Sequence, residues 1–255
     1  MMRTLILICV LIANITQAET LRIGSRNVVV YSPKLLSGKA APLVIALHGG
    51  LGNARQFRFF LNLKQQADRY GFRVVYPQGT LAQAAWAPNG RVWNAGTCCG
   101  TAMQQRVDDV GYLKSVVAQF KAQGLVSQSV AVGHSNGAMM ALRAACDAPN
   151  LFQRVVAIAG PLLLKTCKRQ YKLSVVHLHG ANDRNVPIEG GVGAEGVLQL
   201  NFPAVQMSAN ILEAAGAQVS IEVITATHFL GSINRGLRTE LSLSLPEFVA
   251  KRITQ

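Results

Sequence analysis

Residues 130–142 read VAVGHSNGAMMAL, and this stretch decides the fold. Its first three residues have the composition of a buried strand and its last five that of a buried helix. Between them Gly133-His134-Ser135-Asn136-Gly137 matches G-x-S-x-G, in which a sharp strand-to-helix turn exposes a serine hydroxyl at a helix N-terminus. The two glycines let neighbouring backbone pack close to the serine. The alternative interpretation is a glycine-rich turn capped by that serine.

On either side of this stretch, short apolar runs alternate with longer amphipathic ones. The alternation predicts an α/β fold with a mostly parallel central sheet flanked by helices. We expect strands over residues 27–31, 43–47, 72–76, 129–132, 155–159, 173–178 and 219–224. We expect helices over residues 54–70, 107–123, 137–146, 203–215 and 240–253, the last kinked or divided by Pro246. A loop over 78–105 is long enough to indicate a functional role.

Composition bounds the architecture further. Half of the 255 residues are apolar and 15% are charged, which excludes intrinsic disorder. The length fits a single domain, which we place at residues 19–255. The formal net charge of +13 suggests an anionic surface, polymer or substrate nearby. No motif indicates a nucleic-acid partner, and the oligomeric state stays open.

The first eighteen residues have the pattern of a secretion signal. Arg3 is followed by an apolar run over 5–15 and by Thr16-Gln17-Ala18, which fits a cleavage site. The run is too short for a spanning helix of about 20 residues, so we expect no stable membrane insertion after cleavage. A retained anchor is the alternative. The expected location is therefore secreted or periplasmic.

Four cysteines follow this signal, namely Cys98, Cys99, Cys146 and Cys167. Disulfides persist in exported proteins, and four cysteines allow three connectivities. Cys146 and Cys167 are separated by a helix end, a strand and a turn that could bring them together, whereas the adjacent pair is harder to assign. No histidine lies near them at ligand spacing, so we expect structural cysteines and no metal.

A serine hydroxyl needs a base to become a nucleophile, and in a strand-turn-helix setting the partners follow it in the order acid, then histidine. His228 is the late histidine, in a loop after a strand, and we predict it as the base. Asp183 follows another strand end and is predicted to orient the imidazole. Asp108 and Asp109 are its rivals, but they precede Ser135 and start a helix.

An ester-cleaving serine also needs donors for a developing oxyanion. One is the backbone N–H of Asn136, directly after the serine. The other is expected from His48-Gly49-Gly50-Leu51-Gly52, which follows a buried strand. We predict Gly50, with Leu51 next. A simple glycine-rich turn is the alternative.

Together these motifs resemble the polyhydroxybutyrate depolymerase and feruloyl esterase (LpqC-like) family of secreted α/β-hydrolases, over about residues 27–230. The shared segments are Leu47-His48-Gly49-Gly50, Tyr76-Pro77-Gln78-Gly79, Trp93-Asn94-Ala95-Gly96-Thr97-Cys98-Cys99-Gly100, Val107-Asp108-Asp109-Val110-Gly111-Tyr112-Leu113, the serine motif, His179-Gly180-Ala181-Asn182-Asp183, Val186-Pro187 and Gly190-Gly191.

The resemblance implies an α/β-hydrolase fold and carboxylester hydrolysis by Ser135, Asp183 and His228, without a cofactor. It also implies that the loop around Trp93 and the paired aspartates shape the pocket mouth. Around the histidine, Gly-Gly-Gly-His followed by Trp-Pro-Gly is frequent in the family, whereas this chain reads Thr225-Ala226-Thr227-His228-Phe229-Leu230-Gly231. We predict substrate contacts from four residues, namely Leu51, Trp93, His134 and Phe229.

The predicted function is that of a secreted serine esterase, similar to polyhydroxybutyrate depolymerases. The chain leaves no room for a separate polymer-binding domain, so soluble oligomers or small esters are the expected substrates. A feruloyl or acetylxylan esterase acting on plant polysaccharide is the first alternative, and a peptidase is a more distant one. The third is a non-catalytic hydrolase fold that binds surfaces through its positive charge.

Overall fold

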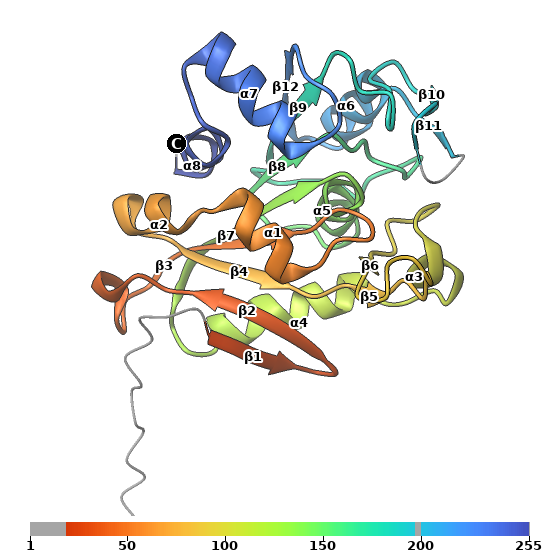
Figure 1. Ribbon diagram of the computed structural model, residues 1–255. Helices are drawn as coiled ribbons and strands as arrows, with labels where there is room; N and C mark the ends of the chain where they lie inside the picture. Colours follow the sequence, from red (N-terminus) through yellow and green to blue (C-terminus); the bar gives the residue numbers. More distant parts are fainter. Residues whose placement is uncertain (1–18, 197–199, 255) are drawn as a thin grey trace, which may run out of the picture.

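The computed structural model describes residues 19–196 and 200–254. Its central element is an eight-stranded sheet in the order β1-β2-β4-β3-β7-β8-β9-β12 (Figure 1). The strands are β1 (Glu19–Ile23), β2 (Arg26–Tyr31), β3 (Ala41–Leu47), β4 (Arg73–Pro77), β7 (Val126–His134), β8 (Arg154–Ile158), β9 (Ser174–Gly180) and β12 (Gln218–Ile224). The first two strands are antiparallel to their neighbours, and the six from β4 to β12 run parallel. The predicted mostly parallel sheet is confirmed, with β1 added ahead of it.

Helices cover both faces of this sheet and form two hydrophobic cores. One face carries α4 (Asp109–Lys121), α5 (Asn136–Asp147) and α6 (Val205–Ala214); the other carries α1 (Ala54–Leu61), α2 (Lys64–Tyr70), α7 (Leu230–Leu241) and α8 (Leu245–Thr254). Along β3, Leu43, Ile45 and Leu47 enter the first core, and Val44 and Ala46 enter the second. This alternation follows from the two-residue period of a strand, and burial on both faces explains the continuous apolar run.

Two predicted helices are each divided in the structure. The helix expected over 54–70 breaks at Asn62, which takes a left-handed conformation (φ 40°) and caps α1. Asparagine tolerates this conformation better than most residues. The helix expected over 240–253 is divided near Pro246, which lies in the first turn of α8, where its missing N–H costs nothing. Helix α7 precedes it and was not predicted.

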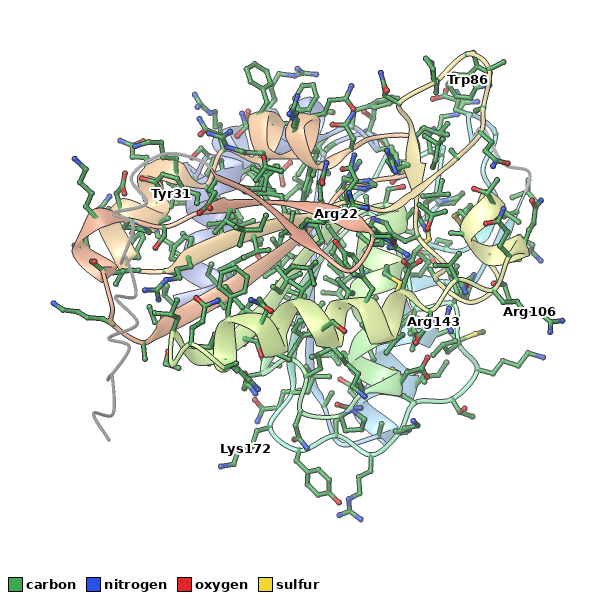
Figure 2. The ribbon with its side chains drawn as sticks, turned by 90° about the horizontal axis from the view of Figure 1, so that it is seen from below. Arg22, Tyr31, Trp86, Arg106, Arg143 and Lys172 are labelled. Atoms are coloured by element: carbon green, nitrogen blue, oxygen red, sulfur yellow. A yellow bond between two sulfur atoms is a disulfide. The ribbon has the colours of Figure 1, made fainter. Side chains whose placement is uncertain are left out.

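The loop expected over 78–105 contains short elements of its own. They are the hairpin β5 (Thr80–Leu81) with β6 (Arg91–Val92), and the helix α3 (Gly100–Gln104). The remaining short elements are the 3-10 helix η1 (Lys34–Leu36) and the pair β10 (Gly191–Val192) and β11 (Asn201–Phe202). Figure 2 shows Trp86 at the outer end of the loop, away from the sheet.

The predicted signal, residues 1–18, lies outside the described residues. Within the part that is described, no helix combines the length and apolar character needed to cross a bilayer. The prediction that an exported chain follows a cleaved signal therefore stays a prediction.

Candidate active site

The serine motif forms a strained turn between β7 and α5. Ser135 has φ 53° and ψ −123°, a conformation that a residue with a side chain adopts only when its surroundings enforce it. The surroundings here are crowded backbone: a side chain at Gly137 would overlap the carbonyl oxygens of Leu47 and His48, and one at Gly133 would overlap the carbonyl of Gly137. Glycine at position 137 lets α5 pack against the end of β3, and glycine at position 133 lets β7 approach the first turn of α5. These contacts hold Ser135 at the end of the sheet.

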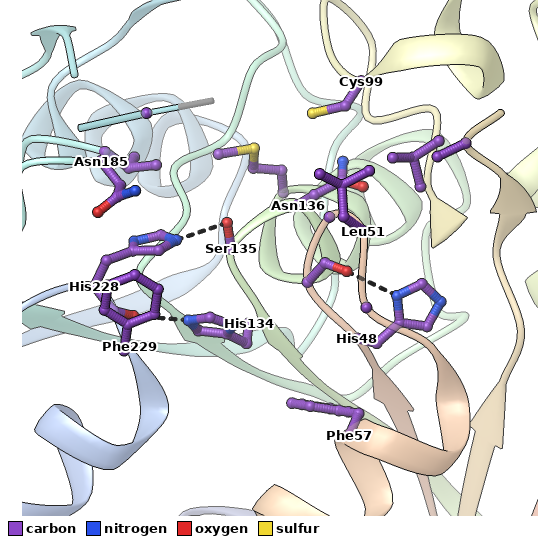
Figure 3. A pocket seen from close by; sticks show the side chains of 18 of the residues that line it. His48, Leu51, Phe57, Cys99, His134, Ser135, Asn136, Asn185, His228 and Phe229 are labelled. Atoms are coloured by element: carbon purple, nitrogen blue, oxygen red, sulfur yellow. Dashed lines mark hydrogen bonds between the residues drawn. The ribbon is translucent and has the colours of Figure 1, made fainter. Parts of the chain in front are cut away.

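The structure brings the three predicted catalytic side chains into one hydrogen-bonded chain. The Ser135 hydroxyl lies 2.9 Å from Nε2 of His228 (Figure 3). Nδ1 of His228 lies 2.7 Å from Oδ2 of Asp183. Because a carboxylate can only accept, His228 carries its proton on Nδ1 and presents an unprotonated Nε2 to the serine. These residues come from three separate loops at the ends of β7, β9 and β12, so the sheet sets their spacing.

The carboxylate of Asp183 is buried and has several donors. Its Oδ1 accepts the backbone N–H groups of Asn185 and Val186, each at 2.9 Å. Burial alone would raise the pKa of Asp183, but the hydrogen bonds from His179 and His228 outweigh it and hold this pKa below its ordinary value. Asp183 therefore stays ionised beside the imidazole, whereas the rival Asp108 caps α4 by accepting the N–H of Gly111.

The backbone N–H groups of Gly50 and Asn136, both near Ser135, have no acceptor among the described residues. They are neighbours, since a Cβ at Gly50 would lie 3.6 Å from Cβ of Asn136. The N–H of Leu51 is already taken, because it donates to the carbonyl of Arg91 at 2.8 Å. Of the two donors expected from this loop, the structure leaves Gly50 available and not Leu51.

Trp93 differs from its expected role in substrate contact. It is fully buried, and its indole N–H donates to the carbonyl of His48 at 3.0 Å. Its backbone N–H and carbonyl are both bound by the side-chain amide of Asn136, at 2.7 and 3.0 Å. Trp93 thus joins the loop of Gly50 to the residue after Ser135. The next peptide N–H, that of Asn94, donates to buried Asp109 at 2.7 Å, so this aspartate also supports the loop.

A cavity of about 610 Å³ opens above Ser135, and the other three predicted contact residues line it. Figure 3 shows Leu51, His134 and Phe229 around the serine. Further lining residues that the sequence does not single out are Phe57, Phe60, Trp86, Asn185 and Phe202. Nothing in the local sequence distinguishes them, because they come from separate elements that meet only in the fold. In the described part of the chain, no Lys, Arg, Asp or Glu side chain lines this cavity.

Two lining histidines are neutral at ordinary pH. Burial lowers the pKa of His48 to about 4 and that of His134 to about 3. His48 is fixed by two contacts: its Nδ1 lies 2.8 Å from the carbonyl of Gly49, and its Nε2 accepts the N–H of Gly79 at 3.1 Å. The cavity therefore has apolar and polar walls but no fixed charge from these two rings.

The cysteines form two disulfides, Cys98–Cys99 and Cys146–Cys167. The first lies in the cavity wall, and the second joins the end of α5 to the loop that follows β8. The open pairing is thereby assigned. Over residues 19–196 and 200–254, no group of three or more His, Cys, Asp or Glu side chains is arranged to hold a metal ion.

The sheet, its flanking helices and the strained serine turn define an α/β-hydrolase, as the sequence predicts. Residues 27–191 match the family described as Esterase PHB depolymerase, and the chain belongs to this family.

Relatives agree with this assignment, and a solved structure shares the fold. The chain is 25% identical over 162 residues to the bifunctional acetylxylan esterase/xylanase XynS20E of Neocallimastix patriciarum, covering 63% of this chain and 22% of that protein. It is 28% identical over 130 residues to feruloyl esterase B of Neurospora crassa, covering 51% and 42%. The chain thus spans less than half of either relative. A carboxylesterase structure from Mesorhizobium loti shares the fold, with a TM-score of 0.62, 15% identity, and coverage of 88% of this chain and 98% of that one.

Proposed function

We propose that this protein is a serine carboxylester hydrolase. The observation that carries the proposal is the continuous chain from the Ser135 hydroxyl through His228 to Asp183, on a turn strained at the serine. A binding module has no use for this order of groups, and the family assignment supports ester hydrolysis.

In the proposed reaction, Ser135 Oγ attacks the ester carbonyl carbon while its proton moves to Nε2 of His228. The carbonyl electron pair moves onto oxygen, and the N–H groups of Gly50 and Asn136 bind the resulting oxyanion. Each such donor typically contributes about 3 kcal/mol of transition-state stabilisation. When the carbonyl re-forms, the alcohol leaves with the proton from His228. Water then attacks the acyl-enzyme by the same route and releases the acid and Ser135. Asp183 keeps its charge and stabilises the imidazolium of each step.

The walls of the cavity support uncharged ester substrates. Aliphatic, aromatic and amide side chains surround the serine, and an ion placed there would lose hydration without gaining a counter-charge. Soluble hydroxybutyrate oligomers with neutral ends and small esters are therefore the proposed substrates. The proposed reaction type is that of the family, and the uncharged cavity walls add the expectation that the substrate carries no charge.

A second candidate is a feruloyl or acetylxylan esterase. The relatives that match the chain carry these activities in their names. The cavity mouth supports an aromatic substrate as well, because Phe60, Trp86 and Phe229 line it from three segments and are 62%, 69% and 62% exposed. Comparing methyl ferulate, an acetylated xylo-oligosaccharide and a capped hydroxybutyrate dimer as substrates separates the two candidates.

The test of the esterase proposal is hydrolysis of p-nitrophenyl butyrate by the wild type and by Ser135→Ala. We expect turnover by the wild type and a loss of at least about 10³-fold in the variant, because within residues 19–196 and 200–254 no other hydroxyl is hydrogen-bonded to the His228 side chain. Circular dichroism and thermal unfolding serve as the folding control. Equal turnover by the two folded proteins would refute the assignment.

We also propose that the protein is exported, with residues 1–18 as a signal and residues 19–255 as one catalytic domain. The two disulfides support an oxidising location. N-terminal sequencing of the exported protein checks the boundary, and an uncleaved Met1 in that fraction would contradict it.

A further inference from the structure

His134 occupies a position between three loops of the site. It is the last residue of β7 and directly precedes Ser135. Its Nε2 lies 2.9 Å from the backbone carbonyl of His228, and the two imidazole rings have centroids 5.0 Å apart (Figure 3). On its other side, Nδ1 faces Gly49 so closely that a Cβ at Gly49 would lie 3.0 Å from it. The ring therefore fills the space between the oxyanion loop and the loop of the base.

The protonation state of this ring follows from its surroundings. A carbonyl oxygen can only accept, so the proton of neutral His134 lies on Nε2. Burial and the neighbouring His228 lower the pKa of His134 to about 3, so the ring stays neutral at ordinary pH. A neutral donor is what this place requires, because a charged ring would oppose the imidazolium that forms on His228 during each step.

The loop that carries His228 has anchors on both sides but few at the histidine itself. The carbonyl of Ala226 accepts the N–H of Asn182 at 2.9 Å, and the carbonyl of Phe229 accepts the N–H of Ser232 at 2.8 Å. At His228, the hydrogen bond from His134 is the one backbone contact found among the described residues. The side chain then reaches both Asp183 and Ser135 from this single backbone position.

From this geometry we infer that His134 is a positioning residue, which sets the distance between Ser135 and His228 by hydrogen-bonding the His228 carbonyl. The inference rests on the proposed function and replaces the expected role of His134 in substrate contact, since the ring nitrogen nearest the base is already engaged. A displacement of about 1 Å in such a pair can cost about 10²-fold in rate. The bond acts on kcat rather than on substrate affinity, because it fixes reacting groups and leaves the outer cavity unchanged.

Three substitutions separate positioning from packing. In His134→Gln, the side-chain amide nitrogen can replace Nε2 as a neutral donor to the carbonyl. In His134→Asn, the amide nitrogen corresponds in position to Nδ1 instead, and it is too far from the His228 carbonyl to donate to it. In His134→Leu, the volume remains and the donor is lost. Each protein is titrated with a fluorophosphonate so that rates refer to folded, reactive sites, and kcat and KM are measured with p-nitrophenyl butyrate.

We expect kcat to fall by about 10-fold or more in His134→Leu and His134→Asn, with KM within twofold of the wild type. We expect His134→Gln to keep kcat within about threefold. The inference is overturned if all three variants lose kcat equally, if none does, or if KM rises while kcat is unchanged. If His134→Leu fails to fold, the comparison of Gln with Asn still decides. An inactive wild type would instead count against the esterase proposal, so the two failures are distinguishable.

Discussion

At the scale of single residues, the site depends on glycine positions where the surrounding backbone leaves no room for a side chain. Gly137 lies against the carbonyl oxygens of Leu47 and His48, and a methyl group there would overlap both. Backbone cannot yield as a flexible side chain can, so α5 would have to move away from β3. The same contact holds the turn at Ser135, which links the stability of the fold to the position of the serine.

We therefore expect Gly137→Ala to lower the free energy of unfolding by about 3 kcal/mol or more, as overpacking in a rigid core does. Urea denaturation provides the measurement. The matched control is Gly231→Ala, in α7, where the new Cβ would approach only Arg235 at 3.8 Å and where alanine favours the helix. Equal unfolding free energies for the two variants would contradict this prediction, because they would show that the backbone around Gly137 accommodates a methyl group without loss of stability.

At the scale of elements, the apolar pattern predicts the six parallel strands well. The inner strands are buried on both faces and contain continuous apolar runs. The edge strand β12 is only partly buried and alternates apolar with polar residues. Helix α7 is not predicted from the sequence, because Gly231 and Gly236 lower the helix propensity of this segment. The structure explains the second glycine: a side chain at Gly236 would come within 3.0 Å of the carbonyl of Thr225 at the end of β12. Close packing against the sheet overrides propensity there, and periodicity alone cannot show it.

Part of the active site is likewise predictable from the sequence and part is not. A motif and the chain order suffice to single out Ser135, Asp183 and His228, which the fold then places together. The role of Trp93 is not readable from the sequence, because a tryptophan in a long loop can either line a cavity or be buried between two loops that it connects. The contact between the two histidines of β9 is not readable from the sequence either, although residues two apart share one face of a strand.

Strand β9 carries these histidines behind the acid. Nε2 of His179 lies 2.9 Å from the carbonyl of Val186 and 3.4 Å from Oδ2 of Asp183, so it carries a proton, and its Nδ1 lies 2.9 Å from Nε2 of His177. Burial, with His179 adding to it, lowers the pKa of His177 to about 3. His177 therefore contacts His179 as a neutral ring, and His179 in turn contacts Asp183.

This arrangement makes the fold sensitive to acid. In the unfolded chain His177 titrates near 6.5, so between that pH and about 3 the unfolded state binds the extra proton and stability falls as the pH falls. We expect this histidine to contribute a slope of about 1.4 kcal/mol per pH unit below 6.5. Urea denaturation of the wild type and of His177→Leu between pH 7.5 and 5 measures the slope. An identical pH dependence in both proteins would contradict the assignment.

At the scale of the whole molecule, a net charge of +13 surrounds a cavity without charged walls in the described part of the chain. The positive surface attracts anions from a distance, and this attraction weakens with salt. Inside the cavity, a carboxylate loses hydration without an ion-pair partner. The two effects oppose each other, and we expect the short-range desolvation to dominate turnover at ordinary salt.

Matched substrates separate these effects. We compare p-nitrophenyl pentanoate, p-nitrophenyl hemisuccinate and the methyl ester of the hemisuccinate, which differ little in size. At 0.15 M salt we expect kcat/KM for the free carboxylate to be about 10-fold or more below that of its methyl-capped form, because the ion is desolvated. Added salt should lower kcat/KM for the anion and leave the neutral esters unchanged. Equal kcat/KM values for the methyl-capped and the free acid would contradict this expectation, because they would mean that a positive group at the site compensates for the desolvation of the carboxylate.

The central claim is that Ser135 is the nucleophile of an esterase, and covalent labelling tests it most directly. A fluorophosphonate reacts with a serine that is activated by its histidine, and mass spectrometry of the digested protein locates the adduct. We predict one adduct per chain, on Ser135, with loss of p-nitrophenyl butyrate hydrolysis in proportion to labelling and no adduct in Ser135→Ala. Full labelling at another residue, or hydrolysis that survives complete labelling of Ser135, would contradict the account.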